Sequence, residues 1–267
     1  MQIRREFRGN LRWQYYLMSG VLVSLWASGC SVARPKPVPT EAEPTTPPAT
    51  TVAPTLTTEP TPAPTVTLSS ICSPLAEHPI SMLLSLYLTQ PFIPPQGANK
   101  ETGHHGLDFA YYHGGPTGGH IEGTPIQSVL DATIIGSGYN AVYGYYVITE
   151  TPFASLPAEV AGQYEAAQGE SLYLLYGHMQ QTAPFALGDI VQCAGVLGHV
   201  GNSGSQQFTS DPHLHLETRV GLSGQAVADM AFYTSDITDE QREEYIRWRT
   251  SDDFRLVDPT MLLEFQP

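Results

Sequence analysis

The sequence predicts a mainly β domain, with an antiparallel sheet or sandwich and a few flanking helices. Two observations support this fold class. Several short segments are rich in β-branched and aromatic residues, and glycine-rich turn signals separate them. Short strands joined by such turns are typical of antiparallel sheets. No phosphate-binding loop, dinucleotide fingerprint or internal repeat is visible in the sequence. We therefore expect residues 71–267 to form one domain with a core of its own.

The expected strands occupy the middle of this domain. They are residues 125–138, 141–150, 171–179 and 213–220, which alternate in polarity or run apolar. The stretches "GSGYN", "LGDIVQCAGVLGHVGNSGS" and "SDP" lie between them and predict turns. Before the first of these strands, residues 75–89 have a weak helical period. Residues 151–170 resemble an insertion that is partly helical.

A second helix is expected near the C-terminus, over residues 238–249. It begins with a capping box, Thr238 with Gln241, and carries acids in its first turns and arginines in its last. We interpret it as a surface helix, and binding a partner is the alternative. The residues expected to pack it onto the domain are Tyr245, Ile246 and Trp248.

The N-terminal segment predicts export. Arg4, Arg5, Arg8 and Arg12 precede an uncharged apolar run, "LMSGVLVSLWA", which is too short to span a bilayer comfortably. The run ends in "ASGC", small residues followed by Cys30, and this resembles a bacterial lipobox. We therefore predict a signal peptide over residues 1–29 and lipidation of Cys30. A plain secretory signal or an uncleaved anchor is the alternative.

Residues 30–70 are expected to be a disordered linker. Between residues 35 and 70 there are 10 Pro and 11 Thr, and such a segment cannot bury a core. It suits a tether between a membrane and a layer above it. The chain as a whole has 12 Lys and Arg against 26 Asp and Glu, a formal net charge of −14. This balance argues against nucleic acid or an anionic membrane surface as a partner.

Three cysteines fit an exported protein. If Cys30 carries lipid, then Cys72 and Cys193 remain, and we predict a disulfide between them. Two buried free thiols are the alternative. Neither cysteine is expected to bind a metal, because no second Cys lies at ligand spacing.

The stretch "DPHLHLE" suggests a metal site. In a strand, His213, His215 and Glu217 share one face, whereas the leucines between them point into a core. Two histidines on one face can place one imidazole on a metal and the other beside a substrate or water. On its own, however, an HxH pattern is more often a surface feature or an accident.

A second stretch, "HHGLD", carries His104 and Asp108. In a straight strand the two would be about 13 Å apart, too far to share one ion. A bend at Gly106 would bring them together, because glycine permits such a bend. With an imidazole from the distant HxH strand they would form a set of two His and one Asp, with an open position for water, as in catalytic zinc sites.

The order of these elements resembles the lysostaphin/LytM family of zinc endopeptidases. The resemblance rests on H-x-G-x-D, a strand ending in "YGH", a glycine-rich segment and H-x-H, and it covers roughly residues 95–220. It implies an antiparallel β fold of the lysostaphin type for residues 71–267. It implies one Zn²⁺ bound by His104, Asp108 and His215, with His178 and His213 as the catalytic histidines.

The remaining polar residues are given lesser roles. His105 occupies the variable position of the motif and is not expected to bind the metal. Glu217 is a candidate hydrogen-bond partner of a ligand. Three further histidines, His113, His120 and His199, have no counterpart in the family and are expected on the surface or in loops.

The resemblance implies an activity and a location. The activity is zinc-dependent hydrolysis of peptide cross-links or stem peptides of bacterial peptidoglycan, by an enzyme outside the cytoplasm, anchored to the membrane through lipid on Cys30. One of His178 and His213 would take the proton of the attacking water, and the sequence does not assign which. The alternative is a non-catalytic module that binds peptidoglycan or activates a hydrolase. A zinc hydrolase for an unrelated small substrate is a third reading.

Overall fold

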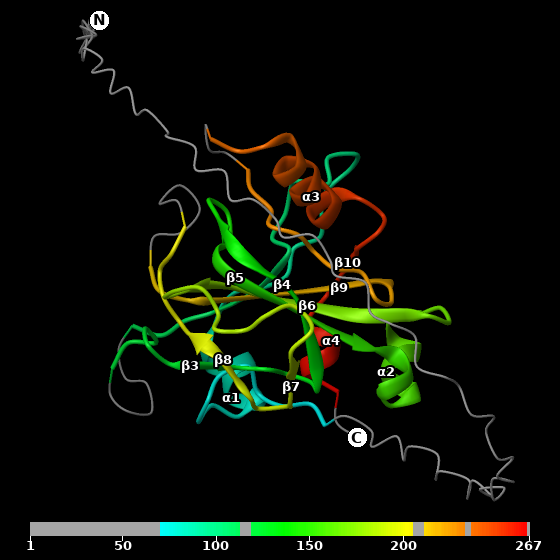
Figure 1. Cartoon of the computed structure of the whole chain (residues 1–267). Coiled ribbons are helices and arrows are strands. Elements are labelled where there is room, and N and C mark those ends of the chain that lie inside the picture. Colours follow the sequence, from blue (N-terminus) through cyan, green and yellow to red (C-terminus); the bar gives the residue numbers. More distant parts are fainter. Residues whose placement is uncertain (1–69, 113–118, 205–210, 233–235, 266–267) are drawn as a thin grey trace, which may run out of the picture. The chain divides into compact units, whose positions relative to one another are not determined.

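The computed structural model describes residues 70–112, 119–204, 211–232 and 236–265 (Figure 1). All of them belong to one unit, Pro62–Pro267. The expected signal peptide, Cys30 and nearly all of the linker lie outside the described residues. Within the described part of the chain, no helix is long and apolar enough to cross a membrane.

Ten strands make up most of the regular structure. They are β1 (Leu88–Gln90), β2 (Gly106–Phe109), β3 (Pro125–Gln127), β4 (Ala132–Asn140), β5 (Gly144–Pro152), β6 (Glu170–Met179), β7 (Ile190–Val191), β8 (Val196–His199), β9 (Leu214–Leu222) and β10 (Arg255–Val257). Six short helical segments accompany them. These are α1 (Ile80–Met82), the π-helix η1 (Leu83–Tyr87), the 3-10 helix η2 (Phe153–Ser155), α2 (Ala158–Gln163), α3 (Asp239–Thr250) and α4 (Thr260–Leu263).

The strands form one large sheet and one small one. The eight-stranded sheet has the order β1-β2-β9-β6-β5-β4-β7, with β10 paired to β9, and β3 and β8 form the second sheet. Every pairing is antiparallel. The prediction of a mainly β, antiparallel fold with a few helices is therefore confirmed.

Both faces of the large sheet are buried. Successive side chains of β6 alternate between two hydrophobic clusters: Leu172 and Leu174 join one, and Tyr173 and Leu175 join the other. Helix α3 covers the second face, whereas β3, β8 and α1 lie on the opposite side (Figure 1). The central strands are therefore held from both sides, which makes them a rigid base for functional side chains.

Helix α3 forms as its sequence predicts. The Thr238 side chain accepts a hydrogen bond from the backbone of Gln241, whose side chain caps Thr238 in return. Tyr245 and Trp248 are buried in the second cluster. The expected packing of Ile246 is wrong, because its side chain points outward and is 44% exposed.

Two other local predictions need correction. The helix expected over residues 75–89 shrinks to α1 and η1, and the chain then becomes strand β1, which pairs with β2. The glycine-rich segment expected as a turn contains β7 and β8. All three strands are at most four residues long, and each depends on a partner strand rather than on its own pattern. Residues 151–170 are partly helical, as predicted, through η2 and α2.

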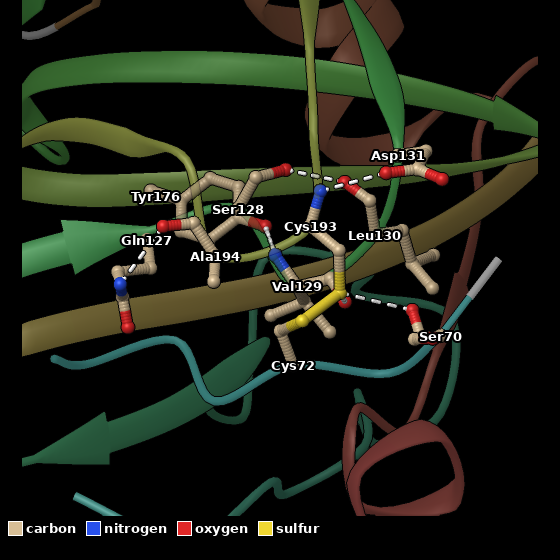
Figure 2. The surroundings of a disulfide bond; sticks show 10 residues. All are labelled: Ser70, Cys72, Gln127, Ser128, Val129, Leu130, Asp131, Tyr176, Cys193 and Ala194. Atoms are coloured by element: carbon tan, nitrogen blue, oxygen red, sulfur yellow. Dashed lines mark hydrogen bonds between the residues drawn. A yellow bond between two sulfur atoms is a disulfide. The ribbon is translucent and has the colours of Figure 1, made fainter. Parts of the chain in front are cut away.

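A disulfide joins Cys72 to Cys193, with the two Cα atoms 5.6 Å apart (Figure 2). It links the segment before α1 to the turn between β7 and β8. Backbone hydrogen bonds support both ends: Cys72 N–H donates to the Val129 carbonyl at 2.8 Å, and Ala194 N–H donates to the Ser128 carbonyl at 2.9 Å. The N-terminal edge of the domain is thus fastened to its small sheet.

Replacing both Cys72 and Cys193 by Ser is expected to lower the free energy of unfolding by about 2–4 kcal/mol, because the bond closes a loop in the unfolded chain. The sequence separation of 121 makes that loop long. Urea denaturation of the full chain measures the difference. A reductant should lower the free energy of unfolding of the unmodified chain by the same amount and leave that of the double variant unchanged. Coincident curves for both proteins would contradict a stabilising role.

Candidate active site

The register of three strands assembles the centre of the site. Within the antiparallel sheet, His215 of β9 lies opposite Asp108 of β2 on one side and opposite Gly177 of β6 on the other. Side chains alternate along β9, so His215 lies on the face covered by α3, whereas Leu214 and Leu216 enter the other core. The strand pairing therefore brings together residues that are 107 positions apart in sequence.

Three ligand atoms converge at this point. Nε2 of His104, Oδ1 of Asp108 and Nδ1 of His215 lie 2.8–3.3 Å from one another: 3.2 Å between His104 and Asp108, 3.3 Å between the two histidines and 2.8 Å between Asp108 and His215. These residues form the one group of three or more His, Cys, Asp or Glu in the described chain whose atoms could share an ion.

The spacing of these atoms fits a zinc ion. Tetrahedral Zn²⁺ with ligand bonds of about 2.0–2.1 Å separates neighbouring ligand atoms by about 3.3 Å. The observed separations match this value with only a small adjustment at Asp108. Two imidazoles and one carboxylate also form a donor set that zinc accepts, with a fourth position left for water or substrate.

The outer nitrogens of both histidines are held by the protein. Nδ1 of His104 donates to the carbonyl of Pro91 at 2.9 Å, which leaves Nε2 as its ligand atom. Nε2 of His215 lies 3.5 Å from Oε2 of Glu217, so Nδ1 faces the ligand group. The carboxylate of Glu217 is fully buried. Such outer partners set the tautomer and the orientation of metal-binding histidines.

Gly106 has a role that differs from a flexible bend. Its φ is outside the left-handed region, so the position does not need glycine for its backbone conformation. A Cβ atom there would instead lie 2.8 Å from Cε1 of His215 and collide with the carbonyl of Leu216. The strand can therefore approach the His215 ring only because residue 106 has no side chain.

Charge in the site is arranged around Asp108 and His215. Burial alone would raise the pKa of Asp108, but hydrogen bonds from His104 and His215 hold it well below its usual value. Burial alone would lower the pKa of His215, but its hydrogen bonds to Asp108 and Glu217 raise it to about 9. Asp108 and His215 thus favour each other's charged forms.

His178 and His213 lie beside the ligand group, with their ring centres 4.4 Å apart. Nδ1 of His178 donates to the carbonyl of Ser203, and Nδ1 of His213 donates to the carbonyl of Asp211, both at 2.8 Å. Each ring therefore keeps Nε2 as its acceptor. Burial, with the neighbouring histidines, lowers the pKa of His178 to about 3, so its imidazole is neutral at pH 7.

The backbone at His178 is unusual. Its φ is +57°, in the left-handed region, which is uncommon for residues other than glycine although histidine, asparagine and aspartate adopt it more often than the rest. The conformation is held on both sides, because its N–H donates to the carbonyl of Tyr143 and its carbonyl accepts from the N–H of Gly201. Strain of this kind is found at functional sites, where the fold imposes a direction on one side chain.

All five residues predicted for the site line one cavity of about 290 Å³. Two further residues of this cavity, Tyr143 and Arg249, were missed by sequence reasoning. Tyr143 lies in the turn before β5, and Arg249 lies in the last turn of α3. In the sequence, Arg249 is one of the arginines in the last turn of a helix, where a cation interacts favourably with the helix dipole. No pattern in the sequence assigned it to the site.

The remaining histidines lie elsewhere or serve another purpose. His105 is buried, and burial lowers its pKa to about 4. It lines the same cavity as the site residues, but its Nδ1 lies 3.1 Å from Nη2 of Arg219. His120 and His199 are exposed. His113 lies outside the described residues.

Comparison with known families gives one match. Residues 102–228 match the model of peptidase family M23. This range contains all five predicted site residues and ends before α3. A comparison with curated proteins found no match.

The chain is also similar to several solved structures. LytU has 22% identity and a TM-score of 0.34, covering 52% of this chain and 74% of its own. The catalytic domain of the prophage-encoded M23 protein EnpA from Enterococcus faecalis has 21% identity and a TM-score of 0.34, covering 52% and 84%. The catalytic domain of the antimicrobial peptidase lysostaphin from Staphylococcus simulans has 17% identity and a TM-score of 0.38, covering 71% and 100%.

Proposed function

Because residues 102–228 match the model of peptidase family M23, we propose that this chain is a zinc endopeptidase that hydrolyses the peptide part of bacterial peptidoglycan. The observation that carries the proposal is the convergence of three ligand atoms, 2.8–3.3 Å apart, beside two histidines that keep an acceptor nitrogen. A module that only binds peptidoglycan would not need these two additional imidazoles.

The proposed ligands are His104, Asp108 and His215. The chemistry that Zn²⁺ supplies when bound is a lowered pKa for water and polarisation of the scissile carbonyl. The residues of the chain keep the ligand atoms aimed at one point. Pro91 and Glu217 fix the two imidazoles, and the pairing of β2 with β9 fixes Asp108.

Proton transfer is assigned to His178 and His213. One of them takes the proton of the attacking water at Nε2, and the other donates a hydrogen bond to the developing oxyanion or protonates the leaving amine. Both rings are anchored through Nδ1 to backbone carbonyls, so the backbone orients each of them. Burial keeps Nε2 of His178 unprotonated at neutral pH, and it also makes this imidazole a weaker base than an exposed one.

The proposed location follows from the N-terminal segment. A signal peptide over residues 1–29 would export the chain, and lipid on Cys30 would anchor it to the membrane outside the cytoplasm. The Pro- and Thr-rich linker would then let the peptidase domain reach the wall. Family membership agrees with this placement, because the proposed substrate lies outside the cytoplasm.

The function is tested by removing and restoring the metal. The full chain is expected to bind one zinc per molecule and to release peptides from purified walls. A chelator should abolish release, and added Zn²⁺ should restore it. Zinc content is measured by elemental analysis, and the released fragments by mass spectrometry, which also identifies the bond that is cleaved.

Two results would contradict the proposal. Normal wall binding without hydrolysis, at full zinc occupancy, would indicate the non-catalytic module. Hydrolysis of small esters but not of wall peptides would indicate a hydrolase for an unrelated substrate.

A further inference from the structure

Arg249 lines the same cavity as the candidate metal ligands, although it comes from a different part of the chain. It lies in the last turn of α3, beyond the residues that match the peptidase family. Among the described residues, Asp108 is the carboxylate that lines the same cavity. An arginine from outside the family domain therefore reaches the proposed active site, and its contacts indicate what it does there.

The guanidinium of Arg249 is directed at the protein rather than at the open cavity. Its Nη1 donates to Oη of Tyr143 at 2.9 Å, and its Nε lies 3.4 Å from a carboxylate oxygen of Glu101. The side chain is only 11% exposed. These contacts hold the group in one place, which suits a residue that acts through its neighbours.

The contact with Tyr143 sets the direction of a chain of hydrogen bonds. Arginine can only donate, so the oxygen of Tyr143 accepts from Arg249 and must give its single hydrogen to another group. That group is Oε2 of Glu217, 2.9 Å away. The hydrogen bond from Arg249 therefore favours the orientation in which the hydroxyl of Tyr143 donates to Glu217.

The same oxygen of Glu217 faces the candidate ligand His215. It lies 3.5 Å from Nε2 of His215 and 3.9 Å from Nη1 of Arg249. The other oxygen, Oε1, is held at 2.5 Å by Nε of Arg219 from β9 itself. The two arginines therefore hold different oxygens, and Arg249 acts on the one that orients the His215 ring.

We propose that Arg249 is a positioning residue of the metal centre, which acts through Tyr143 and Glu217 on His215, so that helix α3 sets the affinity of the site for its metal. The proposal rests on the proposed function, because it assumes that His104, Asp108 and His215 bind the metal. It goes further in making the metal affinity of the site depend on a residue beyond the matched range. The predicted effect of Arg249 is on metal affinity, which can be measured separately from hydrolysis.

The test measures the zinc dissociation constant of the full chain and its variants by competition with a chromophoric chelator. Arg249→Gln and Tyr143→Phe are each expected to weaken zinc binding by about 10- to 100-fold, the usual effect of losing an outer partner. The double variant should bind zinc about as tightly as whichever single variant has the lower affinity, because both substitutions break the same chain of contacts. The Co²⁺-substituted forms should show shifted d–d bands.

The matched control is Arg247→Gln, two residues away on the same helix. Arg247 pairs with Glu244, covers the ring of Phe254 and donates to Gln225 and to the Ala226 carbonyl, and it does not line the cavity. Its zinc affinity should stay within about twofold of the unmodified chain. Tyr143→Phe removes a single hydroxyl, so it decides the question if Arg249→Gln does not fold.

The outcomes separate this inference from the proposed function. Zinc affinity within twofold of normal in both Arg249→Gln and Tyr143→Phe would overturn the positioning role. So would an Arg249→Gln variant with normal zinc affinity and a raised KM, which would assign Arg249 to the substrate. If the unmodified chain binds no zinc at all, it is the proposed function that fails.

Discussion

Replacing His215 by Ala is expected to abolish zinc binding and hydrolysis together. The substitution removes Nδ1, one of three atoms that lie 2.8–3.3 Å apart, and two ligands from one short segment cannot hold the ion alone. Elemental analysis should find no zinc in the purified full chain. Release of peptides from walls should fall to the level of the chelated protein.

A second variant keeps this prediction testable if His215→Ala does not fold. His215→Ala leaves the buried carboxylate of Glu217 without one of its partners, whereas Asp108→Asn keeps the shape of the side chain and should lose zinc as well. The matched control is His120→Ala, which removes an exposed imidazole and should keep zinc and activity. Full zinc content in both site variants would show that the metal binds elsewhere.

Replacing His178 by Asn is expected to lower kcat by about 10²- to 10⁴-fold while zinc content stays at one per chain, because the loss of a proton-transfer group has effects of this size. Asparagine is chosen because the φ of residue 178 is +57°, which asparagine tolerates better than alanine. The measurement is wall hydrolysis at saturating substrate, together with elemental analysis of zinc.

Exposed His199 provides the control for this substitution. His199→Asn makes the same chemical change on β8, outside the cavity, and should retain kcat. Retention of full activity in His178→Asn would show that His213 transfers the proton alone. Loss of zinc in that variant would mean that His178 supports the metal rather than the reaction.

The strands that the sequence predicts are those with a long internal pattern. Residues 171–179 run through β6 and residues 213–220 through β9, and both are rich in leucine, tyrosine or valine. The strands β1, β7 and β8 have two to four residues each, so their pairing depends on tertiary contacts that no local pattern records. Length therefore explains the difference better than residue type.

The site follows the same division. Alternation along a strand places His213, His215 and Glu217 on one face, and the five-residue sequence "HLHLE" is enough to predict this. The approach of Asp108 to His215 depends on the register of β2 against β9, which the spacing of motifs suggests but cannot prove. The contact between Tyr143 and Arg249 joins residues 106 positions apart, and neither belongs to a motif. This contact could therefore be identified only from the structure.

The two edges of the large sheet have a consequence for how the protein behaves when many copies are crowded together. At one edge β1 has three residues; at the other, β7 covers Ala132 and Thr133 of β4, and the N–H groups of Gly188 and Val227 donate to the next two carbonyls of β4. Such edges give little template for growth of a shared sheet into fibrils, even with the side chain of Ile190 81% exposed on β7. Molecules packed side by side on a surface are therefore not expected to join through these edges.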